Sequence, residues 1–189
     1  STHDDLSVVR EGNGARRILA LNFGVGGNPR KKVGDRLEKE LLLNLLQVPD
    51  TVILLDKGVG DEERRGSDAL LAGIQSNGLA VQNGSFETGV DARFQWGVIG
   101  LRTRIGEIAA IIANSDEYIG YDSACQHFAA ALGTPSLTIF AGSNNMRFIR
   151  RWSAFGPNTC KIVHVDTLSD PSAIDVEDII IRIMNARQM

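Results

Sequence analysis

The sequence is poor in the features that mark several special classes of protein. Its two cysteines, Cys125 and Cys160, are too few for the disulfide framework of a small secreted domain. No apolar run approaches the roughly 20 residues that a membrane-spanning helix needs. The polar opening at residues 1–5 does not resemble a signal peptide. We therefore expect a cytoplasmic protein with reduced cysteines and no transmembrane segment.

Excess charge of one sign is also missing. The formal net charge is −3 over 189 residues, which gives no general attraction to nucleic acid or to anionic lipid, so any phosphate binding must be local. With three histidines and scattered carboxylates, the chain shows no metal-ligand spacing. We expect no metal and no cofactor. The length and a hydrophobic content of 43% fit one globular domain.

Apolar runs typical of buried strands alternate with helical periodicity. Strands are predicted at 17–23, 51–55, 79–82, 117–121, 136–141 and 161–165, and helices at 34–47, 67–76, 104–114, 124–132 and 174–186. Residues 56–65 and 143–152 are predicted as loops, and 83–97 stay unassigned. This alternation predicts an α/β fold with a doubly wound, mostly parallel sheet and helices on both faces. We expect the domain to span 17–189, after a polar tail or residual linker at 1–16.

The clearest candidate site follows the predicted strand 117–121. Ser123 and Gln126 have the spacing of a capping box, which predicts a helix that begins after Ser123 and ends at Gly133. Asp122, Ser123 and His127 would then gather at the carboxyl end of a strand, where open α/β sheets bind ligands. A nucleotide diphosphate would suit the free N–H groups there. The plainer alternative is that Asp122 and Ser123 only cap the helix and that His127 is a buried core histidine.

Two other segments could complete a nucleotide site. The glycine-rich loop 24–29 precedes Lys31 and Lys32, either of which could meet phosphate oxygens. The loop matches neither a dinucleotide fingerprint nor a Walker A motif, and a loop with solvated lysines is the alternative. Further along, an acid among 61–63 could bind both hydroxyls of a ribose, or these acids could simply start a helix.

A fourth segment, residues 143–152, is rich in amides and arginines. Arg147, Arg150 and Arg151 could reach a phosphate or an acceptor, or could form an interface with another domain. The sequence does not separate these alternatives.

Residues 117–142 resemble the signature of the heptosyltransferase family of GT-B glycosyltransferases, glycosyltransferase family nine. In that family an Asp-Ser/Thr-Gly-x-x-His motif follows a hydrophobic strand and precedes Ala-Ala-x-Gly-x-Pro, and residues 122–127 and 130–135 stand in those places. Residues 105–111 are similar to the family's Leu-x-Glu-Leu-Ala-Ala-Leu helix, and residues 55–65 to its ribose segment. The similarity covers residues 17–165.

The resemblance implies the donor-binding, C-terminal half of an inverting enzyme that uses a nucleotide-diphosphate sugar, ADP-linked in the heptosyltransferases of lipopolysaccharide biosynthesis. Asp122 would lie near the sugar, Ser123 and the following N–H groups on the diphosphate, Lys31 or Lys32 on phosphate, and one of Asp61, Glu62 and Glu63 on the ribose. The other expected donor-site residues are Gly26, Ala124 and His127.

Two departures from the family pattern matter. Ala124 replaces the family's glycine, which adds a methyl group where a diphosphate should approach the backbone. Family members are also about twice as long, with the acceptor site and the catalytic carboxylate in an N-terminal half. We therefore expect no catalytic residue in this chain, and a missing half in the same chain or in a partner. The acceptor could bring the protein into peripheral contact with a membrane.

Two alternatives stay open. One is a non-catalytic module that binds a nucleotide or a phosphosugar. The other is a GT-B-related nucleotide-sugar epimerase, in which a glutamate typically stands near the place of His127.

Overall fold

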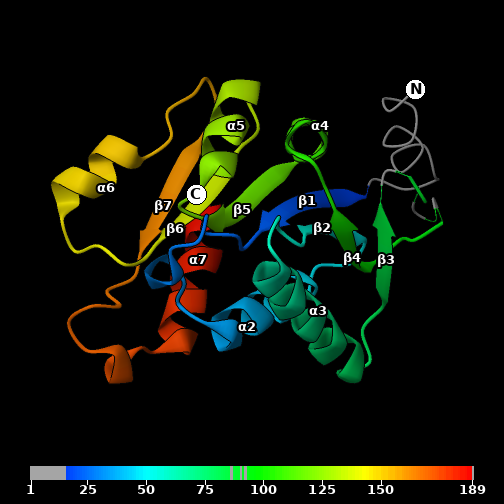
Figure 1. Cartoon of the computed structure of the whole chain (residues 1–189), viewed down its shortest axis with the longest axis horizontal. Helices are drawn as coiled ribbons and strands as arrows, with labels where there is room; N and C mark the ends of the chain where they lie inside the picture. The colour runs from blue at the N-terminus through cyan, green and yellow to red at the C-terminus, as the bar shows by residue number, and fades with distance from the viewer. Residues whose placement is uncertain (1–15, 86, 90, 92, 189) are drawn as a thin grey trace.

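A computed structural model describes residues 16–85, 87–89, 91 and 93–188. The expected tail at 1–16 falls almost wholly outside these residues. A seven-stranded parallel sheet forms the centre of the molecule, with the order β3-β4-β2-β1-β5-β6-β7 (Figure 1). The strands are β1 (Arg17–Asn22), β2 (Thr51–Asp56), β3 (Val81–Ser85), β4 (Gly97–Arg102), β5 (Glu117–Tyr121), β6 (Ser136–Phe140) and β7 (Cys160–His164). The predicted α/β class is confirmed.

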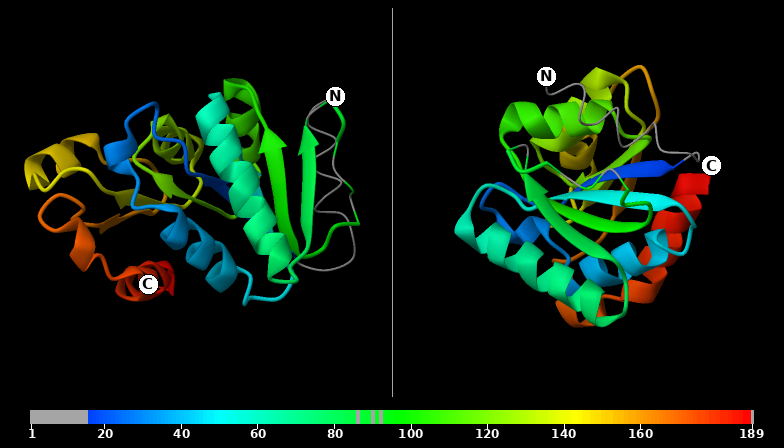
Figure 2. Two further views of the ribbon diagram at one scale, coloured as in Figure 1. Left: turned by 60° about the horizontal axis from the view of Figure 1, so that its bottom comes forward. Right: turned by 90° about the vertical axis from the view of Figure 1, so that its right-hand side faces the viewer.

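Two layers of helices cover the sheet (Figure 2). Helices α2 (Asp35–Leu45), α3 (Asp61–Ser76) and α7 (Val176–Gln188) bury their apolar sides in one core cluster on one face. On the other face, α4 (Ile105–Ala113) and α5 (Ala124–Leu132) pack against the second cluster. The central strands β1 and β2 read as nearly unbroken apolar runs because both of their faces are covered.

The sheet grows in two directions from β1. Strand β2 pairs with one side of β1 and β5 pairs with the other. From β1 the chain passes to β2 and then to the edge strand β3, returns to β4 between these two, and after α4 crosses to β5 and continues to β6 and β7. The reversal leaves a crevice at the carboxyl ends of β1 and β5, the position at which such sheets bind ligands.

Three elements differ from the sequence prediction. Strand β4 was not predicted, because Gly97 and Gly100 interrupt its apolar pattern; the structure needs Gly100 there, since a Cβ would collide with Leu71 of α3. Helix α3 starts at Asp61 rather than at 67, with three acids in its first turn, where the helix dipole favours negative charge.

The third difference lies in the predicted loop 143–152, most of which is helix α6 (Met146–Trp152). Asn145 caps this helix, and its Oδ1 accepts hydrogen bonds from the N–H groups of Arg147 at 3.0 Å and Phe148 at 3.3 Å. Short 3-10 turns at η1 (Pro29–Lys31) and η2 (Pro171–Ala173) complete the described elements. Within this described part of the chain, no helix is both long and apolar enough to cross a bilayer.

Candidate functional site

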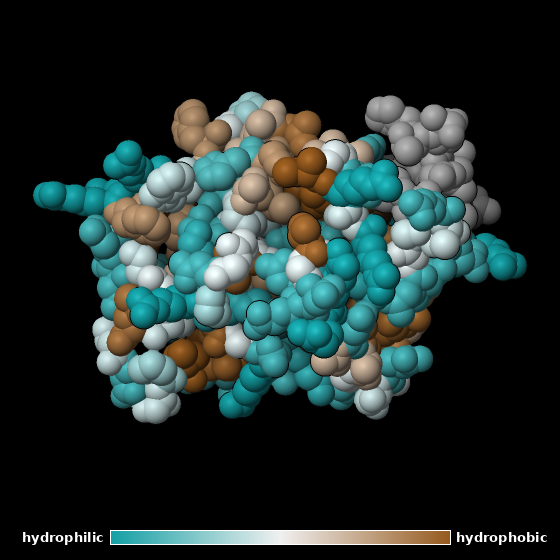
Figure 3. Space-filling view, viewed as in Figure 1, coloured by the Kyte–Doolittle hydropathy of each residue, from teal (hydrophilic) through white to brown (hydrophobic). Residues whose placement is uncertain are grey.

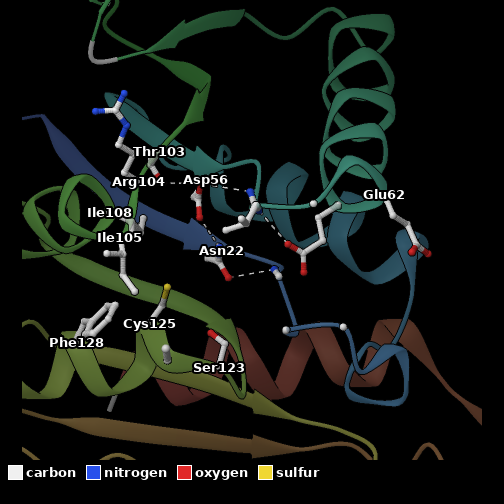
Figure 4. A pocket seen from close by; sticks show the side chains of 18 residues that line it. Asn22, Asp56, Glu62, Thr103, Arg104, Ile105, Ile108, Ser123, Cys125 and Phe128 are labelled. Carbon is white, nitrogen blue, oxygen red and sulfur yellow. Dashed lines mark hydrogen bonds between the residues drawn. The ribbon is translucent and has the colours of Figure 1, made fainter.

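A cavity of about 430 Å³ opens at the carboxyl ends of β1, β2, β4 and β5 (Figure 4). Its walls are the loops after β1 and β2, the first turn of α3, the residues that follow β4 and the first turn of α5. This is the crevice that the reversal at β1 creates. Apolar surface marks its rim, because Val59 is 80% exposed and Ile105 is 72% exposed. Figure 3 accordingly shows hydrophobic surface in the middle of this face, beside α4.

The floor of the cavity is a polar cluster that joins three strands. Asn22 and Asp56 are paired in the β1–β2 register, and Asn22 Nδ2 donates to Asp56 Oδ2 at 2.6 Å. Thr103 Oγ1 donates to Asp56 Oδ1 at 2.8 Å, and the Gly58 N–H donates to the same oxygen at 3.3 Å. Burial raises the pKa of the Asp56 carboxyl, against these hydrogen bonds, which lower it.

Glu63 connects the two glycine-rich loops. Its Oε1 accepts from the Val25 N–H at 3.2 Å, and its Oε2 accepts from the Val59 N–H at 3.1 Å. A Cβ at Gly58, whose φ is +79°, would collide with the Glu63 side chain, so glycine is required there. Glu63 therefore sets the shape of the cavity wall rather than offering a free carboxylate.

The other two acids of the predicted ribose segment point in different directions. Glu62 is exposed and lines the cavity. Asp61 lies outside the lining and forms a 3.5 Å ion pair with Arg64 on its own helix. Of the three acids that spacing could not separate, Glu62 is the one with free carboxylate oxygens at the cavity.

The first turn of α5 meets the cavity through Ser123, Ala124 and Cys125. The helix begins after Ser123 as predicted, but the predicted capping box is wrong. No side chain caps the helix, and Ser123 Oγ is buried without a hydrogen-bond partner. The Gln126 side chain turns instead toward Asp122, to which its Nε2 donates at 2.6 Å. Burial raises the pKa of the Cys125 thiol to about 11, so the thiol is neutral at physiological pH.

Asp122 is 5% exposed and belongs to a buried network. Its Oδ2 lies 2.7 Å from Lys31 Nζ, which also donates to the Asp122 carbonyl at 3.3 Å. Gln126, which is 0% exposed, extends the network to β6 and to the end of α6. Its Oε1 accepts from Thr138 Oγ1 at 3.2 Å and from the Ala154 N–H at 3.3 Å, and its Nε2 also donates to the Trp152 carbonyl.

The remaining predicted site residues are spread over three places. Gly26 and Ala124 line the cavity, whereas Lys31 and Lys32 do not. Lys32 Nζ pairs instead with the buried Glu38 at 3.2 Å. His127 is exposed and outside the lining, so the alternative of a core histidine is wrong. The buried side of α5 is made by residues 125, 126, 129 and 130, and position 127 faces away from it.

Arg147 and Arg150 lie on α6, away from this cavity. Arg147 borders a separate hollow of about 390 Å³ together with Asn145, Phe148, Arg151 and Trp152. The structure thus brings Gly26, Glu62, Ser123 and Ala124 to one cavity and leaves the arginines elsewhere.

Sequence reasoning missed Asn22, Asp56 and Thr103. Asn22 and Asp56 each close a buried apolar strand, and polar residues at that position are a usable signal, because the ends of adjacent parallel strands meet. Thr103 follows β4, which was not predicted. Within the described residues, no group of three or more His, Cys, Asp or Glu side chains could hold a metal ion. The cavity thus combines open backbone with the exposed Glu62 carboxylate, and the buried Ser123 hydroxyl lies beside them; such groups suit a polyhydroxylated anion.

Comparisons with known proteins identify relatives of this fold. Residues 89–168 match the family described as glycosyltransferase family 9 (heptosyltransferase). Among solved structures, E. coli heptosyltransferase WaaC with ADP is matched with a TM-score of 0.62 and 14% identity, over 96% of this chain and 48% of that chain. E. coli ADP-heptose lps heptosyltransferase II is matched with a TM-score of 0.59 and 14% identity, over 97% of this chain and 51% of that chain.

A third solved structure is matched over most of its own length. The solution structure of ALG13 is matched with a TM-score of 0.52 and 15% identity, over 92% of this chain and 86% of that chain. No curated protein sequence matches the chain. The chain spans about half the length of the heptosyltransferases that it matches. At these identities the structural likeness establishes the fold alone.

Proposed function

Since the resemblance to the heptosyltransferases of glycosyltransferase family 9 is confirmed, we propose that this chain is the donor-binding half of such an enzyme. The cavity would hold a nucleotide-diphosphate sugar, and the sugar would pass with inversion to an acceptor held by a second half. A cytoplasmic role in lipopolysaccharide biosynthesis and an ADP-linked donor follow from the resemblance and belong to the proposal.

The observation that carries the proposal is the uncapped start of α5 at the cavity. N–H groups in the first turn of a helix attract anions when no side chain caps them. The buried Ser123 hydroxyl, which has no partner, adds a donor beside them. Across the cavity, Gly26 and Gly27 have positive φ values and open space around them. Backbone donors thus border the space that a diphosphate would occupy, with the buried Ser123 hydroxyl next to them.

The acids of the cavity suit the neutral parts of the same ligand. Glu62 has carboxylate oxygens free to accept from ribose hydroxyls. The exposed Val59 and Ile105 side chains at the rim offer an apolar surface to a base. Lys31 would reach phosphate only by leaving Asp122, whose Oδ2 could then accept from a sugar hydroxyl while Oδ1 keeps its bond from Gln126.

A module that binds the same ligand without catalysis is the second candidate. No histidine lines the cavity among the described residues, and its charged groups are Asp56, Glu62, Glu63 and Arg104. The fold also occurs as most of a solved chain, that of ALG13. Transfer activity of this chain after addition of a separate acceptor half would decide between the two candidates.

Calorimetric titration with ADP, UDP, GDP and their sugars tests donor binding. Two or three charge-assisted hydrogen bonds contribute about 1.5–3 kcal/mol each. After the loss of association entropy, we expect a dissociation constant of about 10 μM to 1 mM. Glu62→Gln should weaken binding and Asp61→Asn should not, because Asp61 lies outside the cavity. No heat with any nucleoside diphosphate at millimolar concentration would refute the proposal.

A further inference from the structure

We propose that α6 and the residues after it form a docking surface for an anionic phospholipid membrane. The proposal concerns the far end of the sheet from β3, where α6 projects at the left of Figure 1 and of the left view in Figure 2. It is independent of the donor cavity. The surface, called the α6 surface below, consists of the exposed side chains of Met146, Arg147, Phe148, Arg150, Arg151, Trp152 and Phe155.

Large apolar side chains are concentrated on this surface. Ile149 is the single buried residue of the helix. Phe155 is 96% exposed, Met146 52% and Trp152 48%. The rings of Phe148 and Trp152 lie together, with centroids 6.2 Å apart. Tryptophan is typical of the interface between water and lipid, because its apolar body and its indole N–H match the headgroup region, and phenylalanine is common on the apolar side of interfacial helices.

The same surface carries unpaired positive charge. No residue from 123 to 165 is acidic, whereas this span holds three arginines of α6 and Lys161 in a chain of net charge −3. In the described part of the chain, Arg147, Arg150 and Arg151 make no ion pair and no side-chain hydrogen bond. Their guanidinium groups are therefore free for phosphate groups.

The arrangement of the two kinds of side chain favours lipid over protein. Arg147, Arg150 and Arg151 form one stripe on α6, at i, i+3 and i+4, and Phe148 and Trp152 form a second stripe, at i and i+4. Charged and apolar stripes thus lie next to each other, whereas a protein interface shows a dry centre with a charged rim. Figure 3 shows hydrophilic and hydrophobic surface interleaved over α6. In the headgroup layer, rings can enter the acyl boundary while neighbouring guanidiniums bind phosphates.

The fold holds the α6 surface in place before any partner arrives. Gln126 binds the Trp152 carbonyl at 3.2 Å and the Ala154 N–H at 3.3 Å. Gly156 packs so closely on the backbone of Ala130 that a Cβ would collide there. A surface ordered in advance loses little conformational entropy on binding.

Co-sedimentation of the full chain with vesicles tests the proposal. Vesicles of phosphatidylglycerol and phosphatidylcholine should bind the protein at about 0.1 M salt, and phosphatidylcholine vesicles should not. Each arginine near an anionic surface contributes about fivefold in affinity, so the triple variant R147Q/R150Q/R151Q should lose about 100-fold. Phe155→Ser should also weaken binding, because it removes an apolar anchor without changing charge.

Matched controls separate this surface from general charge. The triple variant R36Q/R65Q/R102Q removes three exposed arginines elsewhere and should bind almost as the parent does. Ile181→Ser removes an apolar residue that is 53% exposed on α7 and should have no effect. Unchanged melting temperatures establish that the variants fold.

Four results would overturn the proposal. The first is that the parent protein does not bind phosphatidylglycerol vesicles. The second is that the two triple variants lose vesicle affinity equally. The third is that inorganic phosphate at constant ionic strength displaces the protein from vesicles, which would indicate a site for free phosphate. The fourth is a concentration-dependent dimer that the α6 variants abolish while vesicles bind nothing, which would assign the surface to a second copy of the chain.

Discussion

Lys31 Nζ lies 2.7 Å from Asp122 Oδ2, and this ion pair joins the loop after β1 to the end of β5. The two residues flank the strand reversal but lie outside the lining of the cavity, so their pairing fixes the two segments beside it. The carboxylate is almost completely buried, whereas about a quarter of the lysine side chain is accessible, at 27%. The pair is therefore a structural contact as it stands, and a ligand that recruits either residue must replace it.

Removing one partner of this pair should cost more than removing both. Lys31→Met leaves a buried carboxylate without its cation and should lower the free energy of unfolding by about 2–4 kcal/mol. Asp122→Asn should cost less, because Lys31 can extend into solvent. The double variant K31M/D122N should recover part of the Lys31→Met loss, as urea denaturation of the three variants will show. If the double variant loses as much stability as the two single variants together, the two residues are not coupled.

The Asp122→Asn variant also tests a role of Asp122 in ligand binding. If Asp122 meets sugar hydroxyls, Asp122→Asn should weaken a nucleotide sugar more than the bare nucleotide. Equal losses for both ligands would remove Asp122 from the sugar site.

Gln126 should be the most sensitive polar residue of α5. Its amide holds four partners, Asp122, Thr138, Trp152 and Ala154, and is fully buried. Gln126→Ala leaves several of these groups unpaired and should destabilise the fold by about 2–4 kcal/mol. Gln47→Ala is the control, because exposed Gln47 donates only to Leu43 of its own helix region. A loss at position 126 no larger than at position 47 would contradict the network.

How far the sequence predicts this molecule depends on whether a residue's role is local. The strands around β1 and β5 were predicted correctly, since covered strands need unbroken apolar runs. The α5 start and the Gly133 end were also predicted, and Gly133 adopts a φ of 73°. The Ser123–Gln126 capping box failed, because Gln126 satisfies a partner network that spans residues 122 to 154. Asn22 and Asp56 each end a buried apolar strand, which the sequence does show, but their hydrogen bond depends on the β1–β2 register, which a single sequence does not reveal.

Glu38 should make stability depend on pH. Burial raises the pKa of its carboxyl above the ordinary value of 4.5, although Lys32 acts in the opposite direction. A carboxyl with a raised pKa in the folded state contributes stability that is complete below pH 4.5 and is lost as pH rises through the folded value. Wild type should therefore lose stability relative to Glu38→Gln over that window.

Thermal melting at intervals from pH 4 to pH 7 measures this difference. Glu177→Gln, an exposed acid on α7, serves as the control. A wild-type protein that instead gains stability over Glu38→Gln as pH rises would show that the Lys32 pair outweighs burial.

Ser123 separates ligand binding from helix capping most cleanly. A serine that caps a helix contributes about 1 kcal/mol, which its replacement by alanine removes. Here the Ser123 hydroxyl caps nothing and has no partner, so Ser123→Ala should leave the melting temperature unchanged. Loss of a donor to a charged diphosphate should weaken nucleoside diphosphates and their sugars alike, by about 1.5–3 kcal/mol, or at least tenfold.

Asn145→Ala provides the contrast for Ser123→Ala. Asn145 is a true cap, whose Oδ1 accepts from two N–H groups of α6, and it lies outside the cavity at the carboxyl ends of the strands. Its replacement should lower stability by about 1 kcal/mol and leave nucleotide affinity intact. If α5 binds the diphosphate, calorimetry will show weaker binding for Ser123→Ala alone, and thermal melting will show a lower melting temperature for Asn145→Ala alone. A drop in melting temperature for Ser123→Ala with unchanged affinity would instead assign Ser123 to the fold, because a hydroxyl that touches only the protein cannot affect a ligand.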